Sequence, residues 1–311
     1  MTQGEGVERI EERCPTATCG ARQDSRYNEG VGIKLIAMDV DGTLLDSTSH
    51  VPPENARTIA EAAARGIEIV LVTGRRFDFV KHIAEQLPCE VHLIVNNGAL
   101  IKSRSGETHQ RNLLPANVAR RVLESAQEFR ASAAVVFDRP EAPQVVMEKV
   151  DWDDPVRGAY FRRNRKYIAE VNPLVDCIGR DDPIQVMYVG GCQAMHAAKK
   201  ALQEFPFADA YTLALTEYEN RNLSILDVLK RGVTKGVALA EWSRRLGIAR
   251  EETMAIGDNW NDREMLEFAG VPVVMGNAVA ELKSLGWAVT LTNDQNGVAE
   301  AIRVHALNGD R

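Results

Sequence analysis

Short apolar runs alternate with amphipathic stretches along most of the chain after residue 32. Outside the middle of the chain, the runs that we predict as buried strands lie at 33–38, 67–72, 93–95, 254–256, 271–275 and 288–291. The stretches that we predict as helices lie at 54–65, 77–86, 237–246, 262–269 and 278–285. Strands that alternate with helices of this length indicate βαβ units and a parallel sheet.

The middle of the chain has a different pattern. Its short strand candidates lie at 133–137, 144–147 and 184–188, and helical stretches at 118–129 and 194–204 separate them. We interpret this segment as an insertion into the core. The expected fold class is therefore α/β: a doubly wound parallel Rossmann-like core, made of residues 31–112 and 224–305, with an inserted α+β cap domain at 113–223. Residues 1–30 are polar and lack periodicity, which predicts a disordered tail.

Composition narrows the class of protein. The chain has 311 residues, of which 45% are hydrophobic and 26% charged, as in a globular protein with more than one domain. Its net charge of −7 argues against nucleic-acid and anionic-membrane partners. No apolar stretch approaches the roughly 20 residues that span a bilayer, and the N-terminus does not resemble a signal peptide, so we expect a cytoplasmic protein. The five cysteines show no CxxC spacing, which favours reduced thiols.

The most informative motif follows the first predicted strand. It is Asp39-Val40-Asp41-Gly42-Thr43, and it lies at the carboxyl end of the strand, where open α/β sheets place their ligands. Two carboxylates separated by one residue can share one site and have different tasks. One can act as a nucleophile and the other can exchange protons with a leaving group.

Three further motifs follow in order along the chain. Thr73-Gly74-Arg75 comes after the second predicted strand, and Gly232-Val233-Thr234-Lys235-Gly236 precedes a predicted helix. Gly257-Asp258-Asn259-Trp260-Asn261-Asp262 comes after a later strand. The chain thus offers an acid pair, a hydroxyl group, a lysine and an acidic cluster, with three of the four at strand ends.

This set of motifs resembles the haloacid dehalogenase superfamily of phosphohydrolases, and within it the Cof-like branch with an α/β cap. The resemblance covers roughly residues 31–305. It implies that Asp39 is the nucleophile that becomes an aspartyl phosphate, and that Asp41 is the acid and base. It further implies that Lys235 stabilises the phosphoryl charge, and that Thr73, Gly74, Arg75 and Asn261 contact phosphate or substrate.

The resemblance also implies a metal site formed by the Asp39 carboxylate, the Asp41 backbone carbonyl and the Asp258 carboxylate, with Asp262 in a supporting role. Hard oxygen ligands around a phosphate dianion favour Mg²⁺, since Lys235 alone cannot offset so much negative charge. The expected partner is a small phosphorylated metabolite. The motifs leave its identity and the oligomeric state open.

The function that we predict is a Mg²⁺-dependent phosphatase for small phosphomonoesters, with sugar phosphates as the leading class. A phosphotransferase or mutase would use the same intermediate, and a receiver-like signalling module shares acidic, Thr and Lys residues but is shorter. Asn97 either approaches the substrate or only forms a turn. The basic run at 157–166 is either a solvated helix face or a surface that attracts multiply anionic substrates.

Overall fold

The structure, a computed structural model, describes residues 1, 32–141, 143–154, 158–218 and 221–308, and residues 31–311 form one compact unit. The predicted disorder of residues 1–30 concerns residues that, except for Met1, lie outside those described. Three of the five cysteines are described, and all three are free thiols: Cys89, Cys177 and Cys192.

The first sheet has the strand order β14-β13-β12-β1-β2-β3-β4-β5. Neighbours from β14 to β3 pair in parallel, whereas β4 and β5 are added antiparallel at the edge. The strand bounds are β1 Leu35–Met38, β2 Glu68–Val72, β3 His92–Val95, β4 Leu100–Ser103, β5 Thr108–Arg111, β12 Thr253–Gly257, β13 Val271–Val274 and β14 Ala288–Val289.

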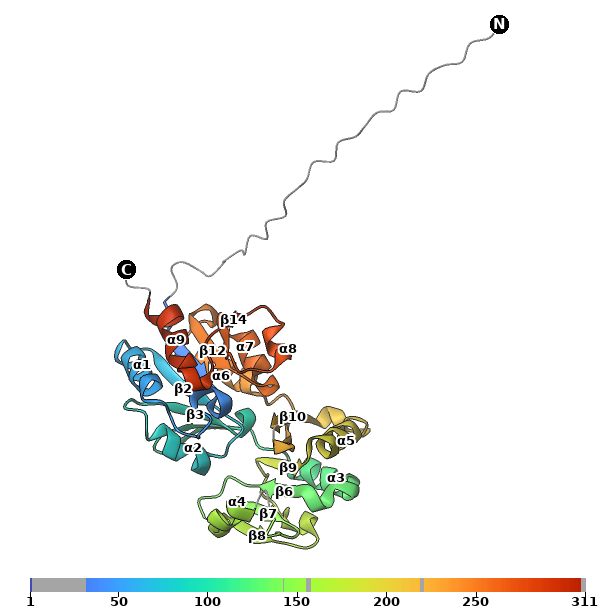
Figure 1. Cartoon of the computed structure of the whole chain (residues 1–311). Helices are drawn as coiled ribbons and strands as arrows, with labels where there is room; N and C mark the ends of the chain where they lie inside the picture. Colours follow the sequence, from blue (N-terminus) through green and yellow to red (C-terminus); the bar gives the residue numbers. More distant parts are fainter. Residues whose placement is uncertain (2–31, 142, 155–157, 219–220, 309–311) are drawn as a thin grey trace. The chain divides into compact units, whose positions relative to one another are not determined.

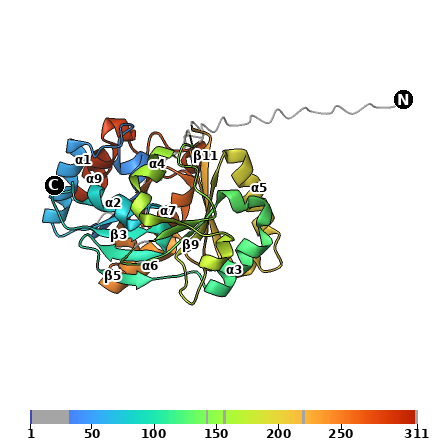
Figure 2. The ribbon, with the colours of Figure 1, turned by 90° about the horizontal axis from the view of Figure 1, so that it is seen from below.

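Helices cover this sheet because its central strands are apolar on both faces. All four residues of β1 are fully buried. α1 packs against α9, and α6 packs against α7, which contacts β12 and β13 (Figures 1 and 2). The helix bounds are α1 Pro53–Ala64, α2 Phe77–Ala84, α6 Lys235–Leu246, α7 Arg263–Phe268, α8 Ala280–Lys283 and α9 Gly297–Ile302.

Local chemistry fixes where α6 begins and ends, and so where Lys235 lies. The Thr234 side chain accepts a hydrogen bond from the backbone N–H of Val237, which is an N-cap interaction. Gly247 ends the helix with a φ of 70°, in the left-handed region that glycine adopts without strain. Lys235 is therefore the first residue of a well-defined helix.

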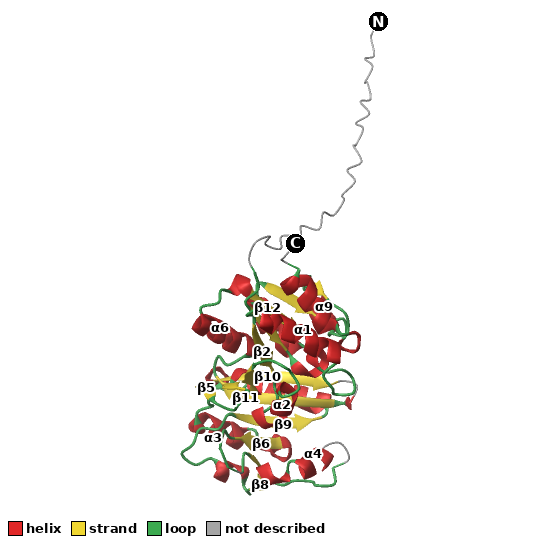
Figure 3. Ribbon diagram, turned by 90° about the vertical axis from the view of Figure 1, so that its left-hand side faces the viewer, coloured by secondary structure: helices red, strands yellow, loops and turns green. Residues whose placement is uncertain are grey.

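The second sheet is formed by the middle of the chain and has the strand order β10-β11-β9-β6-β7-β8 (Figure 3). Its own apolar cluster includes residues from β6, β9 and β11 and from two helices that pack on them. The element bounds are α3 Ala116–Ser125, β6 Ala133–Val136, β7 Val145–Met147, α4 Gly158–Arg163, β8 Ile168–Glu170, β9 Gln185–Gly190, α5 Cys192–Gln203, β10 Tyr211–Tyr218 and β11 Leu223–Lys230.

The fold class is the predicted one: a doubly wound, mostly parallel core with an inserted α+β segment. Several details differ from the sequence analysis, which also did not predict β10 and α9. The β4–β5 hairpin was not predicted, because Thr108–Arg111 is polar and has no apolar alternation. β8 is a three-residue strand of exposed and half-buried residues, which gives no periodic signal. Residues 224–230, assigned to the core by sequence, lie in β11 and pair with β9 and β10. The domain boundaries themselves stay predictions.

Among the described residues, no helix combines the length and the hydrophobicity that a membrane span requires.

Candidate active site

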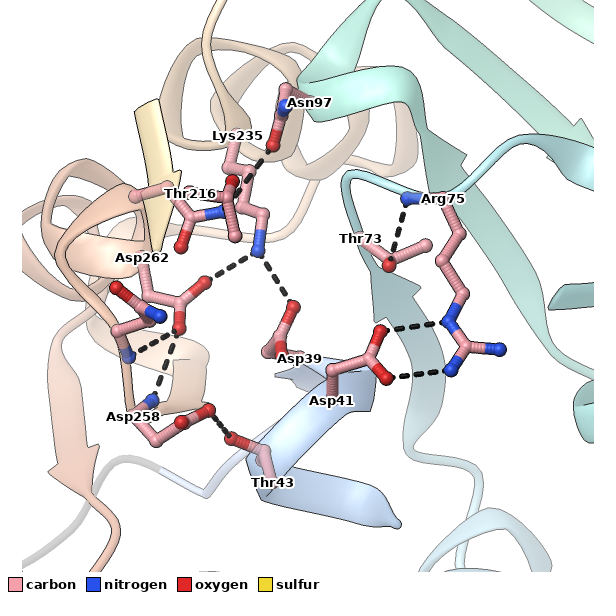
Figure 4. Close-up of polar contacts among 12 residues, drawn as sticks. Asp39, Asp41, Thr43, Thr73, Arg75, Asn97, Thr216, Lys235, Asp258 and Asp262 are labelled. Atoms are coloured by element: carbon pink, nitrogen blue, oxygen red, sulfur yellow. Dashed lines mark hydrogen bonds and ion pairs between the residues drawn. The ribbon is translucent and has the colours of Figure 1, made fainter. Parts of the chain in front are cut away.

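The sheet topology brings the predicted site residues together. β12, β1 and β2 are parallel neighbours, so their carboxyl ends lie side by side at one edge of the first sheet. Asp39 follows β1, Thr73 follows β2 and Asp258 follows β12. Figure 4 shows these three side chains at this edge, together with the Lys235 side chain from α6.

Lys235 is the centre of the polar contacts. Its Nζ donates to Asp39 Oδ1 and to Asp262 Oδ1, at 2.6 Å in each case. All three residues are buried, with exposures of 2% for Lys235, 5% for Asp39 and 0% for Asp262. Burial alone would lower the pKa of Lys235, but Asp262 and Asp39 raise it above its ordinary value. The lysine is thus a fixed cation in direct contact with the predicted nucleophile.

Asp262 organises the loop after β12. While its Oδ1 accepts from Lys235, its Oδ2 accepts from the backbone N–H groups of Asp258 and Asn259, at 3.0 Å each. The polar helix start that the sequence suggested is present, since Asp262 and Asn259 form a capping box. The structure adds the buried ion pair with Lys235. Both oxygens of Asp262 are therefore engaged in holding the lysine and the loop.

Asp258 is held from the other side of the site. Thr43 Oγ1 donates to Asp258 Oδ1 at 2.8 Å. Gly42, with a φ of 81°, lies so close that a Cβ atom at this position would collide with the Asp258 carboxylate. The glycine of the first motif is therefore required both for its backbone conformation and for the space that Asp258 occupies.

The electrostatics of this cluster favour a cation. Carboxylate oxygens of Asp39, Asp258 and Asp262 lie within 4.8 Å of one another. Burial, opposed chiefly by Lys235, raises the pKa of Asp39 to about 7. Burial, followed by Asp39 and Asp262, raises the pKa of Asp258 well above its ordinary value. In the described part of the chain, no hydrogen bond reaches Oδ2 of Asp39 or of Asp258. These two oxygens are free to bind a hard metal ion.

Asp41 and Arg75 form a second pair beside the cluster. The guanidinium of Arg75 donates to both carboxylate oxygens of Asp41, and Thr73 Oγ1 accepts the backbone N–H of Arg75 at 3.1 Å. The neighbouring Arg76 turns elsewhere: its Nη2 donates to Gln144 Oε1 and to a carboxylate in α2. Arg75 therefore contacts the acid pair directly.

Asn261, predicted to contact phosphate, links the first sheet to the second. Its Nδ2 donates to Thr216 Oγ1 at 3.2 Å and to Asn97 Oδ1 at 3.4 Å. Asn97 is buried and lies beside Gly74, where a Cβ atom would be 3.2 Å from the Asn97 amide. Figure 4 shows Asn97 and Thr216 next to Lys235. Asn97 also lies in a short turn with a φ of 53°, so an approach of Asn97 to the substrate stays a prediction.

Sequence reasoning missed several residues near the site. Thr43 is the last residue of the first motif, and its place in that motif was the signal that could have marked it as a site residue. Tyr218, at the end of β10, has its pKa raised by burial and then by the charges of Asp41 and Asp39. No sequence signal marked it, because it comes from the second sheet.

The basic run at 157–166 is partly described. α4 lies between β7 and β8, at the edge of the second sheet away from β10. Arg162 donates to the backbone of Trp152 and lies 3.3 Å from Asp153, while the Arg165 guanidinium lies 4.8 Å from the Trp152 ring centre. Arg157 lies outside the described residues. These local contacts are those of a solvated helix face, and a role in substrate choice stays a prediction.

Comparisons with known proteins agree with this geometry. A sequence model of haloacid dehalogenase-like hydrolases matches residues 36–302. Phosphatase YwpJ of Bacillus subtilis is 32% identical over 295 residues, which are 87% of this chain and 99% of that protein. HMP-PP phosphatase of Serratia proteamaculans is 31% identical over 252 residues, 81% of this chain and 87% of that protein.

A solved structure of a haloacid dehalogenase-like hydrolase from Bacteroides thetaiotaomicron has a TM-score of 0.72 and 29% identity. The similarity covers 88% of this chain and 99% of that one, so it includes the inserted segment as well as the core. The four motifs, the fold and the matched length lead to one conclusion: the chain belongs to the haloacid dehalogenase-like hydrolase family, in its Cof-like branch.

Proposed function

We propose that this hydrolase is a Mg²⁺-dependent phosphatase that acts on small phosphomonoesters, with sugar phosphates as the leading class, through an aspartyl phosphate. The observation that carries the proposal is the environment of Asp39. This buried carboxylate ends β1 and lies 2.6 Å from the Lys235 ammonium. Such a carboxylate can attack phosphorus while the ammonium balances the phosphoryl charge. The names of the two relatives support the reaction class.

The reaction has two displacements at phosphorus. In the first, an Asp39 carboxylate oxygen bonds to phosphorus, the ester P–O bond breaks, and Asp41 gives its proton to the departing oxygen. In the second, Asp41 takes a proton from a water molecule whose oxygen attacks phosphorus. The Asp39–phosphorus bond then breaks and inorganic phosphate leaves. One acid/base residue serves both steps because the second step restores to Asp41 the proton that the first step removed.

The remaining residues hold the phosphoryl group. Thr73 Oγ1 and the Gly74 backbone N–H donate to phosphoryl oxygens, and Lys235 faces them from α6. Arg75 and Asn261 contact the substrate at the border of the site. These donors are fixed before the substrate arrives, so catalysis comes mainly from positioning and charge stabilisation.

The acidic cluster fits Mg²⁺. The Asp39 and Asp258 carboxylates and the Asp41 backbone carbonyl would hold the ion, whereas Asp262 supports them, because both its oxygens are engaged by protein donors. When bound, Mg²⁺ would neutralise negative charge on the transferring phosphoryl group.

The inserted segment acts as a cap that excludes bulk water and contacts the leaving group. Its strand β10 supports this role, since Thr216 and the Glu217 carbonyl accept hydrogen bonds from Asn261 and Asn259. We therefore expect substrate choice to depend on the cap, and we expect the enzyme to work in the cytoplasm. A receiver-like module is set aside, because the match to the hydrolase family includes the insertion.

The test is phosphate release from a panel of phosphomonoesters, with and without Mg²⁺, for the wild type and Asp39→Asn. We expect Mg²⁺-dependent release that Asp39→Asn abolishes, with sugar phosphates ranked first. A second assay adds an acceptor sugar and analyses the products. Transfer of the phosphoryl group to the acceptor, in place of phosphate release, would contradict the phosphatase proposal and indicate a mutase.

A further inference from the structure

A carboxylate that the proposed mechanism does not use lies between the second sheet and the active site. Asp227 belongs to β11 and is 2% exposed. Leu226 and Val228, its neighbours along the strand, belong to the apolar cluster of the second sheet, whereas Leu229 belongs to the cluster of the first sheet. Because side chains alternate along a strand, Asp227 and Leu229 face the first sheet together.

Two amides bind this carboxylate. Asn97 Nδ2 donates to Asp227 Oδ2 at 2.9 Å, and Gln185 Nε2 donates to Asp227 Oδ1 at 2.6 Å. No ion pair among the described residues includes Asp227. Burial raises its pKa to about 7, although the Asn97 hydrogen bond acts in the opposite direction. A buried acid without a cation costs stability, so packing alone would favour an apolar residue here.

The carboxylate determines which way the neighbouring amides point. When ionised, the Asp227 carboxylate only accepts hydrogen bonds, so each amide turns its NH₂ group toward it and its oxygen away. The oxygen of Asn97 then accepts from Asn261 Nδ2 at 3.4 Å. In the same way, Gln185 Oε1 accepts from Asn96 Nδ2 at 3.1 Å. An amide in place of Asp227 would remove this constraint.

The oriented Asn97 lies against the loop that we propose binds phosphate. Its backbone N–H donates to the Thr73 carbonyl at 3.0 Å, and its side chain is next to Gly74. The Asn97 φ of 53° is in the left-handed region, which few residues other than Gly, Asn and Asp adopt. A change in the orientation of Asn97 would therefore alter the surroundings of Thr73 and Gly74, which we propose bind the phosphoryl group.

The hydrogen bonds return to the second sheet. From Asp227 on β11 they run through Asn97 and Asn261, both in core loops, to Thr216 on β10. β10 and β11 are paired neighbours, so this chain of contacts attaches two adjacent cap strands to two core loops. The cap thereby determines how these loops present their amides.

We propose that Asp227 is a positioning residue for phosphoryl transfer, which orients Asn97 and through it Asn261 beside the phosphate-binding loop. The inference rests on the proposed function. Asp227 touches no reacting atom and acts through Asn97. We therefore expect its substitution to lower kcat more than it changes KM.

The first test compares the wild type with Asp227→Asn, a substitution of nearly equal size. With para-nitrophenyl phosphate as the probe, we expect kcat to fall at least about tenfold, since small misplacements near the chemistry are costly. KM should change less than about threefold, because ground-state binding is retained. A variant with unchanged kcat, or with a raised KM at full kcat, would overturn the inference.

Asp138→Asn is the matched control. Asp138 also joins the middle segment to the first sheet, because it accepts from Lys102 Nζ at 3.0 Å and from Arg111 Nε at 2.8 Å, but it has no contact with the site amides. We expect this variant to have a lower Tm and an unchanged kcat. Equal loss of kcat in both variants would mean that Asp227 only attaches the cap, and would overturn the inference.

A double variant tests whether Asp227 acts through Asn97. If it does, Asp227→Asn combined with Asn97→Ala is no slower than Asn97→Ala alone, whereas multiplied losses would overturn the inference.

Side-chain amide NMR gives a readout without turnover. The Asn97 and Asn261 signals should shift in Asp227→Asn and stay in Asp138→Asn, and unshifted signals would overturn the inference. An inactive wild type with these shifts would contradict only the proposed function.

Discussion

Arg75 binds both carboxylate oxygens of Asp41, with its Nε 2.7 Å from Oδ2 and its Nη2 2.6 Å from Oδ1. The pair is partly solvated, since the two side chains are 28% and 29% exposed. We therefore expect this ion pair to contribute more to the orientation of Asp41 than to the free energy of unfolding. The bidentate contact with the Arg75 guanidinium holds Asp41, the proposed acid/base, beside the phosphate-binding loop before any substrate binds.

The first prediction concerns this bidentate ion pair between Arg75 and Asp41. Arg75→Lys keeps the charge but removes the two-pronged contact, and we expect kcat/KM to fall about 10- to 100-fold. Steady-state kinetics with one good substrate measure the effect. Arg76→Lys is the matched control, because it changes the adjacent arginine, whose Nη2 donates to Gln144 and to Asp78 in α2. A larger kinetic loss in Arg76→Lys than in Arg75→Lys would contradict the assignment.

The second prediction concerns the buried cation. Lys235→Met removes the only positive charge in contact with Asp39 and Asp262 among the described residues. We expect kcat to fall at least about 100-fold, as for the loss of one preorganised donor to a transition state. Lys102→Met removes another buried lysine, which pairs with Asp138, and should reduce Tm with little effect on kcat. Retained turnover in Lys235→Met would rule out its proposed role.

The third prediction concerns Thr43, which no motif-based assignment included. Thr43→Val preserves shape but removes the hydrogen bond to Asp258. Since such contacts orient metal ligands, the Mg²⁺ concentration for half-maximal activity should rise about 10- to 100-fold. Thr253→Val, at another fully buried threonine whose hydroxyl bonds to Ser243 in α6 and to the Ala249 carbonyl, should leave the Mg²⁺ dependence unchanged. Equal Mg²⁺ dependence in all three proteins would disprove a role for Thr43.

The fourth prediction concerns pH and metal together. The folded-state pKa of Asp39 is raised to about 7, and that of Asp258 is also raised. Their contribution to stability is therefore present below the unfolded-state pKa and is lost as pH rises through the folded-state pKa. Without metal, Tm should fall over this range.

Mg²⁺ binds the ionised carboxylates, so it should raise Tm more at about pH 8 than at about pH 5.5. Differential scanning calorimetry at both pH values measures the shift, and Asp258→Asn should lose most of it. A Mg²⁺-induced shift that is equal at the two pH values, or unchanged in Asp258→Asn, would argue against the proposed metal site.

Much of the core followed from local sequence. β1 and β12 are continuous apolar runs with motif residues directly after them, so both the strands and the edge where Asp39 and Asp258 meet were predictable. The same is true of Lys235, because glycines flank it at the start of a helix. Parallel topology then brings these residues together without further information.

The contacts between the two sheets were not predictable from sequence. Asp227 lies in an apolar strand that reads as core, and nothing local shows that Asn97, 130 positions away, binds it. Thr216 on β10 likewise meets Asn261 only because the second sheet folds against the first. Such partners are set by tertiary packing, which local patterns do not encode.

The most direct measurement is the mass of the peptide that contains Asp39 after the reaction is stopped with acid in the first turnover. The account predicts that a fraction of the wild-type peptide carries one phosphoryl group, on Asp39, and that the label disappears as phosphate is released. Asp39→Asn should show neither label nor turnover. Phosphate release with the label on another residue, or undiminished release in Asp39→Asn, would contradict the assignment of Asp39 as the nucleophile.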